Sequence, residues 1–194
     1  MYETDYYGHH ATTTLARPVA IAGFIGAGVP AIARAVSAQT GIPFINLSRW
    51  VEHARGKSIA NLVLHDGECA LRSAEEEGLA RGLQGAPPPI IALGHGALLS
   101  PKSRALLRDR DAILMYLQAP LGVLADRARA QIARARTKHY PYFTEHSDGA
   151  ADLEALFSAR LPGYLDAQVT VSIAELSTLE ASHAIMKHLP VAAT

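Results

Sequence analysis

The chain has 194 residues, of which 49% are hydrophobic and 19% are charged, so its composition excludes a disordered protein and its length indicates one domain. Its 18 Lys and Arg residues balance 18 Asp and Glu residues, which excludes the broad basic surface that nonspecific binding to nucleic acids or anionic membranes requires. A single cysteine, Cys69, excludes an internal disulfide framework, and we expect its thiol to be buried. The sequence has neither an apolar run of about 18 residues nor the features of a secretory signal. We therefore expect a cytoplasmic protein with no membrane and no direct nucleic-acid partner.

Segments with the periodicity of strands alternate with segments that have the periodicity of helices. Residues 1–16 are polar and aromatic without a period, which predicts a flexible N-terminal tail before one domain over 17–194. The alternation of strands and helices indicates an α/β fold, here a three-layer sandwich around a five-stranded parallel sheet. In chain order we expect a strand over 19–24, a helix over 31–40, a strand over 43–47, helices over 49–55, 58–64 and 67–83, a strand over 89–93, a helix over 101–110, a strand over 111–117, helices over 120–136 and 151–158, a strand over 169–173 and a helix over 178–189.

Two polar segments carry further expectations. Glu75, Glu76 and Glu77 lie on the long predicted helix, and we expect them to form a solvated face. Residues 137–149 are aromatic, polar and aperiodic, and their length predicts a lid over a binding site.

A glycine-rich junction follows the first predicted strand. Glycines between a strand and a helix let backbone N–H groups converge on a phosphate at the start of the helix. A phosphate-binding loop reads G-x-x-x-x-G-K-[ST], and Gly23, Gly26 and Gly28 fit this spacing. Val29 stands where the lysine belongs and Pro30 stands where the metal-binding hydroxyl belongs. The glycines therefore indicate either a phosphate loop without its charge and its hydroxyl, or only a tight turn.

From Val19 to Leu189 the chain resembles shikimate kinase, a P-loop family related to the nucleoside-monophosphate kinases. The resemblance implies a P-loop kinase-like fold with a lid, and phosphorylation of shikimate by ATP with Mg²⁺. It rests on five collinear segments, residues 23–48, 57–79, 90–107, 114–130 and 159–167.

The resemblance also implies roles for individual residues. Arg72 and Arg160 match two arginines that bind the shikimate carboxylate, a contact suited to the bidentate guanidinium. Gly94 and Gly96 match the outer glycines of a triplet that approaches substrate and phosphate. Arg127 matches a position that lies against the adenine.

Several positions depart from the family pattern. Asn46 and Ser48 stand where the family has two aspartates, one for the metal and the reacting hydroxyl and one for substrate hydroxyls. His95 replaces the middle glycine of the triplet. Either Arg136 or Lys138 stands in for the arginine that the family's lid carries. Four positions that handle charge, metal or proton in the family are thus neutral in this chain.

These departures favour a repurposed protein. We expect it to bind a shikimate-like or aromatic cyclic carboxylate, to have lost ATP- and Mg²⁺-dependent phosphoryl transfer, and to act as a lyase, dehydratase or isomerase of aromatic or secondary metabolism. We expect no cofactor and no metal site. The expected acid–base residues are His95 and His139, the latter on a lid with Tyr140 and Tyr142, although His95 also fits a role as a mere space filler.

Two alternatives remain open from the sequence. One is a ligand-sensing domain of a regulator of aromatic catabolism, which binds an aryl-CoA. The other is an impaired but ATP-dependent shikimate kinase. The sequence does not give the oligomeric state.

Overall fold

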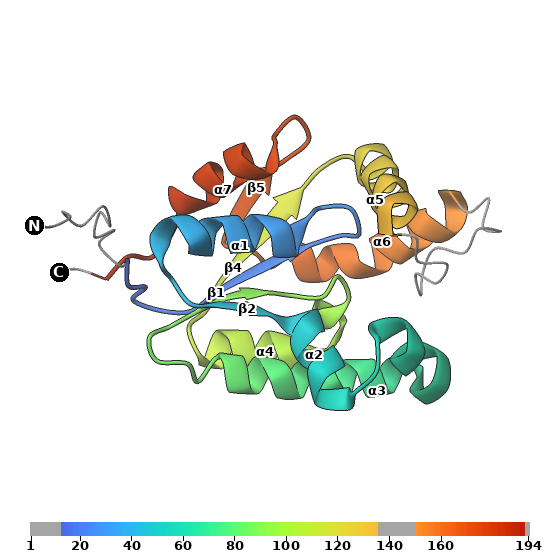
Figure 1. Ribbon diagram of the computed structural model, residues 1–194, viewed down its shortest axis with the longest axis horizontal. Helices are drawn as coiled ribbons and strands as arrows, with labels where there is room; N and C mark the ends of the chain where they lie inside the picture. Colours follow the sequence, from blue (N-terminus) through green and yellow to red (C-terminus); the bar gives the residue numbers. More distant parts are fainter. Residues whose placement is uncertain (1–12, 136–149, 193–194) are drawn as a thin grey trace, which may run out of the picture.

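The computed structural model describes residues 13–135 and 150–192, and its centre is a five-stranded parallel sheet (Figure 1). The strand order is β2-β3-β1-β4-β5, so β1 lies in the middle and pairs Val19 with Ile90 on one side and with Ile113 on the other. The strands are β1 (Val19–Gly23), β2 (Phe44–Asn46), β3 (Ile90–Ala92), β4 (Ile113–Gln118) and β5 (Val169–Ser172).

Helices cover both faces of the sheet. In Figure 1, α1 and α7 lie above it, whereas α3 and α4 lie below it. Every residue of β1 and β3 is buried, as expected for parallel strands enclosed between two helical layers. The helices are α1 (Val29–Thr40), α2 (Leu47–Arg55), α3 (Ile59–Gly82), the short 3-10 helix η1 (Ala97–Leu99), α4 (Pro101–Asp109), α5 (Leu121–Ala135), α6 (Ala150–Leu165) and α7 (Thr178–Met186).

The predicted α/β fold, a three-layer sandwich around five parallel strands, is confirmed. The break expected between two helices before residue 67 is present inside α3, where Gly67 has φ 84° and ψ 168°. The short helix η1 was not predicted, because three residues are too few to show a helical period. Within the described ranges, no helix is long and apolar enough to cross a membrane.

Three expectations about burial were wrong. Leu15, expected in the flexible tail, is 2% exposed and belongs to the core, and its neighbour Ala16 donates a backbone hydrogen bond to Pro190. Cys69 is exposed rather than buried. Glu75, expected on a solvated face, is 3% exposed. The rest of the expected tail, residues 1–12, and the expected lid over 137–149 lie outside the described residues.

We predict that Leu15→Ala lowers the free energy of unfolding by about 3 kcal/mol, because the substitution leaves a cavity in a closed core. Urea denaturation measures this change. Val191→Ala is the matched control, because Val191 faces Leu15 across an isolated β-bridge but is itself 55% exposed. Equal stabilities of the Leu15→Ala variant and the wild type would show that residues up to 16 are a tail without a structural role.

Candidate functional site

The loop between β1 and α1 has the backbone of an anion-binding turn. Gly26 has φ 85°, and a Cβ there would lie 2.0 Å from the carbonyl oxygen of Leu124, so only glycine fits. Gly28 has φ 72° and precedes the first turn of α1, which has no side-chain cap. Backbone N–H groups of such a glycine loop are donors for a phosphate, whereas in the first turn of α1 Pro30 has no N–H and Ala31 donates to the carbonyl oxygen of Gly28.

The two positions after Gly28 bring neither a charge nor a hydroxyl to this loop. Val29 is 4% exposed and belongs to the hydrophobic core, whereas Pro30 lies in the first turn of α1. Among the described residues, no group of three or more His, Cys, Asp or Glu side chains converges as metal ligands do. The two positions therefore leave the phosphate contacts to the backbone of the loop and offer no hydroxyl as a ligand for Mg²⁺.

A cavity of about 320 Å³ opens beside the loop, between α1, α5 and the segment that joins β5 to α7. Arg127 lies in its wall and donates hydrogen bonds from Nη2 to the carbonyl oxygens of Ile173 (3.0 Å) and Ala174 (2.9 Å). The guanidinium is therefore fixed at the edge of the space next to the phosphate loop. Other lining residues are Gly26, Gly28, Ile32, Gln131, Ser177 and Thr178.

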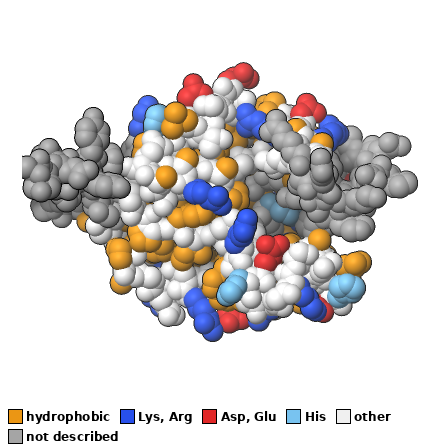
Figure 2. Space-filling model, viewed as in Figure 1, with side chains coloured by type: hydrophobic (Ala, Val, Ile, Leu, Met, Phe, Trp, Pro, Cys, Tyr) orange, Lys and Arg blue, Asp and Glu red, His pale blue; other side chains and the backbone are white. Residues whose placement is uncertain are grey.

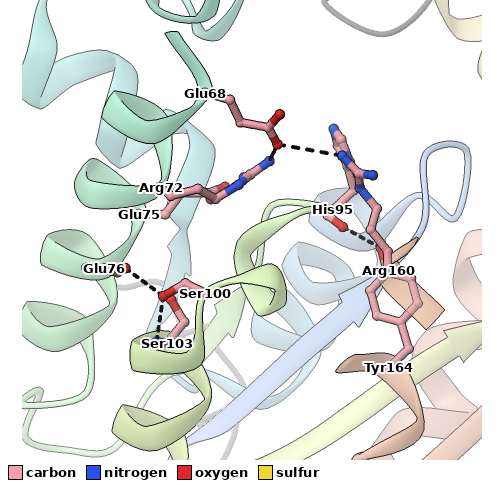
Figure 3. A network of polar contacts seen from close by, with 9 residues as sticks. All are labelled: Glu68, Arg72, Glu75, Glu76, His95, Ser100, Ser103, Arg160 and Tyr164. Carbon is pink, nitrogen blue, oxygen red and sulfur yellow. Dashed lines mark hydrogen bonds and ion pairs between the residues drawn. The ribbon is translucent and has the colours of Figure 1, made fainter. Parts of the chain in front are cut away.

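Arg72 and Arg160 converge beyond the carboxyl end of β3, although they come from different helices (Figure 3). Arg72 lies on α3 and passes so close to Gly96 that a Cβ there would be 2.2 Å from Nη2. A glycine at position 96 is thus a condition for this placement of Arg72. Arg160 lies on α6 with its side chain 3% exposed, and its Nη1 donates to the carbonyl oxygen of Leu156 at 2.9 Å.

Two glutamates of α3 accompany Arg72. Glu75 Oε2 lies 2.5 Å from Arg72 Nη1, and Glu68 Oε1 lies 2.5 Å from Nη2. Burial raises the pKa of the Glu75 carboxyl group, and the charge of Arg72 opposes that rise. The sequence reasoning missed both glutamates. Their positions, four residues before and three after Arg72, were the signal that could have found them, because such residues share a helix face.

His95 holds Arg160 through its ring. Arg160 Nε donates to His95 Nδ1 at 3.2 Å, so the neutral ring carries its proton on Nε2. Burial, followed by the nearby charges of Arg160 and Arg72, lowers the pKa of His95 to about 3. The imidazole is therefore neutral at physiological pH and acts as an acceptor, which opposes the acid–base role expected from the sequence.

Tyr164 joins the arginine pair to the phosphate loop. Its hydroxyl donates to the carbonyl oxygen of His95 at 2.5 Å and lies 3.3 Å from that of Gly23. The ring is 1% exposed and stacks on Tyr116 of β4 at 5.0 Å between centroids. A residue that the sequence reasoning did not single out thus fixes α6 against both ends of the site.

Of the remaining expected residues, Asn46 and Ser48 are described by the structure and five are not. Asn46 Oδ1 accepts from the backbone N–H of Arg49 at 3.2 Å and so caps α2. Ser48 and Glu75 both lie beside Gly94, so these positions border the arginine pair. Five expected residues lie outside the described residues, namely Arg136, Lys138, His139, Tyr140 and Tyr142.

Comparison with known proteins gives consistent matches. The sequence profile of the family described as shikimate kinase matches residues 25–190. The shikimate kinase of Thermobifida fusca is 33% identical over 178 residues, which are 91% of this chain and 97% of that protein. The shikimate kinase of Ruegeria pomeroyi is 32% identical over 157 residues, 81% of this chain and 76% of that protein. Among solved structures, the shikimate kinase from Acinetobacter baumannii in complex with shikimate aligns with a TM-score of 0.79 at 22% identity, covering 92% of this chain and 94% of that one.

These relatives correct two expectations. The prediction of a repurposed lyase, dehydratase, isomerase or sensor is wrong, because proteins about a third identical over most of the chain are named shikimate kinases. The expectation of no cofactor, with ATP and Mg²⁺ doubtful, is wrong for the same reason, because the relatives are named kinases and the resemblance to that family implies ATP and Mg²⁺.

We predict that in His95→Asn the free energy of unfolding falls less than in the wild type when the pH is lowered. Histidine has a pKa near 6.5 when unfolded and about 3 in the folded protein, so the unfolded state binds the proton first. The stabilisation that neutral His95 gives to the folded state is then complete above about pH 6.5 and is lost as the pH falls toward about 3. Urea denaturation between about pH 7 and about pH 4 should show a steeper loss for the wild type. Parallel curves for both proteins would contradict the low pKa.

Proposed function

Because this chain belongs to the shikimate kinase family, we propose that it transfers a phosphoryl group from ATP to a hydroxyl of a shikimate-like cyclic carboxylate. One observation carries the proposal. The hydroxyl of Tyr164 lies within hydrogen-bonding distance of the carbonyls of both Gly23 and His95, so the start of the phosphate loop lies next to the backbone that carries His95, the partner of Arg160.

In this proposal Arg72 and Arg160 bind the carboxylate of the acceptor. A guanidinium offers two parallel N–H donors to a carboxylate, and two guanidiniums from different helices fix the orientation of the ring that bears it. Holding two reactants in one geometry supplies a large part of a phosphoryl-transfer rate. The substrate hydroxyl oxygen then bonds to the γ-phosphorus and its proton passes to water, while the bond between the γ-phosphorus and the β–γ bridging oxygen breaks and ADP leaves.

The nucleotide is proposed to lie with its phosphates at the uncapped start of α1 and its base in the cavity lined by Arg127. Backbone N–H groups of the glycine loop then carry the phosphate contacts, because Val29 and Pro30 supply neither a cation nor a hydroxyl. Loss of one electrostatic stabiliser typically costs about 10²- to 10³-fold in rate. We therefore propose a slow kinase whose weakness lies in the loop rather than in acceptor binding.

The direct test is ADP release in a coupled assay with ATP, Mg²⁺ and shikimate. We expect release that depends on shikimate and that disappears in Arg72→Ala, because this variant removes a carboxylate contact. ADP release that is independent of the acid, or that survives Arg72→Ala unchanged, would contradict the proposed acceptor site.

We predict that Val29→Lys combined with Pro30→Ser raises kcat by about 10²-fold, because the lysine neutralises the β- and γ-phosphates and the hydroxyl ligates the metal. The matched control is Val29→Met combined with Pro30→Ser, which has a long side chain without a charge. Equal kcat values for the two double variants would show that charge at position 29 does not limit the rate.

A further inference from the structure

Glu68 places a carboxylate of the protein between the two arginines. Its Oε1 lies 2.5 Å from Arg72 Nη2 and 3.9 Å from Arg160 Nη2. Figure 3 shows the carboxyl group directed into the gap between the guanidiniums, with an interaction drawn to each. The gap that the proposed function assigns to the carboxylate of a ligand thus holds a carboxylate of α3.

The two glutamates beside Arg72 differ in how firmly they are held. The side chain of Glu75 is 4% exposed and contacts Nη1, on the inner side of the guanidinium. The side chain of Glu68 is 46% exposed and contacts Nη2. Water reaches the carboxylate of Glu68, although the side chain of Arg72 is only 13% exposed, and competes for that charge. Glu68 rather than Glu75 is therefore the partner that an incoming anion displaces.

The backbone at Glu68 also favours displacement of its side chain from Arg72. Gly67 interrupts α3 with a left-handed φ of 84°, and its surroundings leave open space around a Cβ at that position. Glu68 is the first residue after this break. Its side chain therefore projects from the first residue of the second part of α3 and not from the middle of a continuous helix.

From these contacts we infer that Glu68 is an internal competitor that sets the affinity of the site for carboxylate ligands. The inference deepens the proposed function and rests on its assignment of Arg72 and Arg160 to the acceptor carboxylate. A ligand carboxylate takes the same Nη2 donors, so Glu68 must swing away or remain as a like charge beside it. Either event makes binding of a carboxylate weaker than the arginine pair alone allows.

The test is isothermal titration of Glu68→Gln with shikimate and, separately, with its uncharged methyl ester, in the absence of ATP. We expect Glu68→Gln to bind shikimate about fivefold more tightly than the wild type, a factor suited to an ion pair with one solvent-exposed partner. We expect it to bind the methyl ester with the affinity of the wild type. The matched control is Glu77→Gln, on the same helix, because Glu77 pairs with Arg55 and Arg81 away from the site. That control should leave both affinities unchanged.

Three results would overturn the inference. Weaker or unchanged binding of shikimate by Glu68→Gln would mean that Glu68 supports Arg72 rather than competing with its ligand. An equal gain for the methyl ester would mean a general change of the site. Absence of shikimate binding by the wild type and both variants would mean that the arginine pair is not a site for this carboxylate. If binding follows the expected order but no phosphoryl transfer occurs, only the proposed reaction fails.

Discussion

The contact between Tyr164 and the backbone of His95 is the constraint on which the site depends. Tyr164 and Arg160 are four residues apart on α6, so they share one face of that helix. Docking the tyrosine against the carbonyl of His95 therefore also places the guanidinium of Arg160 over the end of β3. Since the same hydroxyl lies near the carbonyl of Gly23, the phosphate loop and the arginine pair keep a fixed relation.

The distribution of buried charge explains why this arrangement suits an anionic acceptor. Buried charges are tolerated when they are paired or hydrogen-bonded. Arg72 meets this condition through the carboxylates of Glu75 and Glu68. The partners of Arg160 include the ring of His95, the carbonyl of Leu156 and, at 3.9 Å, the carboxylate of Glu68. On the face shown in Figure 2, Lys and Arg side chains of the described residues lie among Asp and Glu side chains and do not merge into a stripe.

Sequence patterns predicted the fold well because alternation and glycine positions are local features. They placed every strand and the break at Gly67 within a few residues. They failed for Leu15 and Glu75, whose burial depends on contacts with distant segments, and for the low pKa of His95, which arises from burial and from arginines on two helices. The family resemblance was right. The functional conclusion drawn from it was wrong, because relatives about a third identical are named shikimate kinases, and neutral residues in the phosphate loop do not by themselves identify a different reaction.

The proposed reaction requires the phosphate loop and the arginine pair to hold a nucleotide and a cyclic carboxylate side by side, so that a phosphoryl group passes between them. Phosphorus NMR of the protein incubated with ATP, Mg²⁺ and shikimate tests it most directly, because it identifies the product. The account predicts a new phosphomonoester resonance that grows together with those of ADP and is absent when shikimate is left out. Accumulation of ADP and inorganic phosphate without a phosphomonoester, or no change in ATP at all, would contradict it.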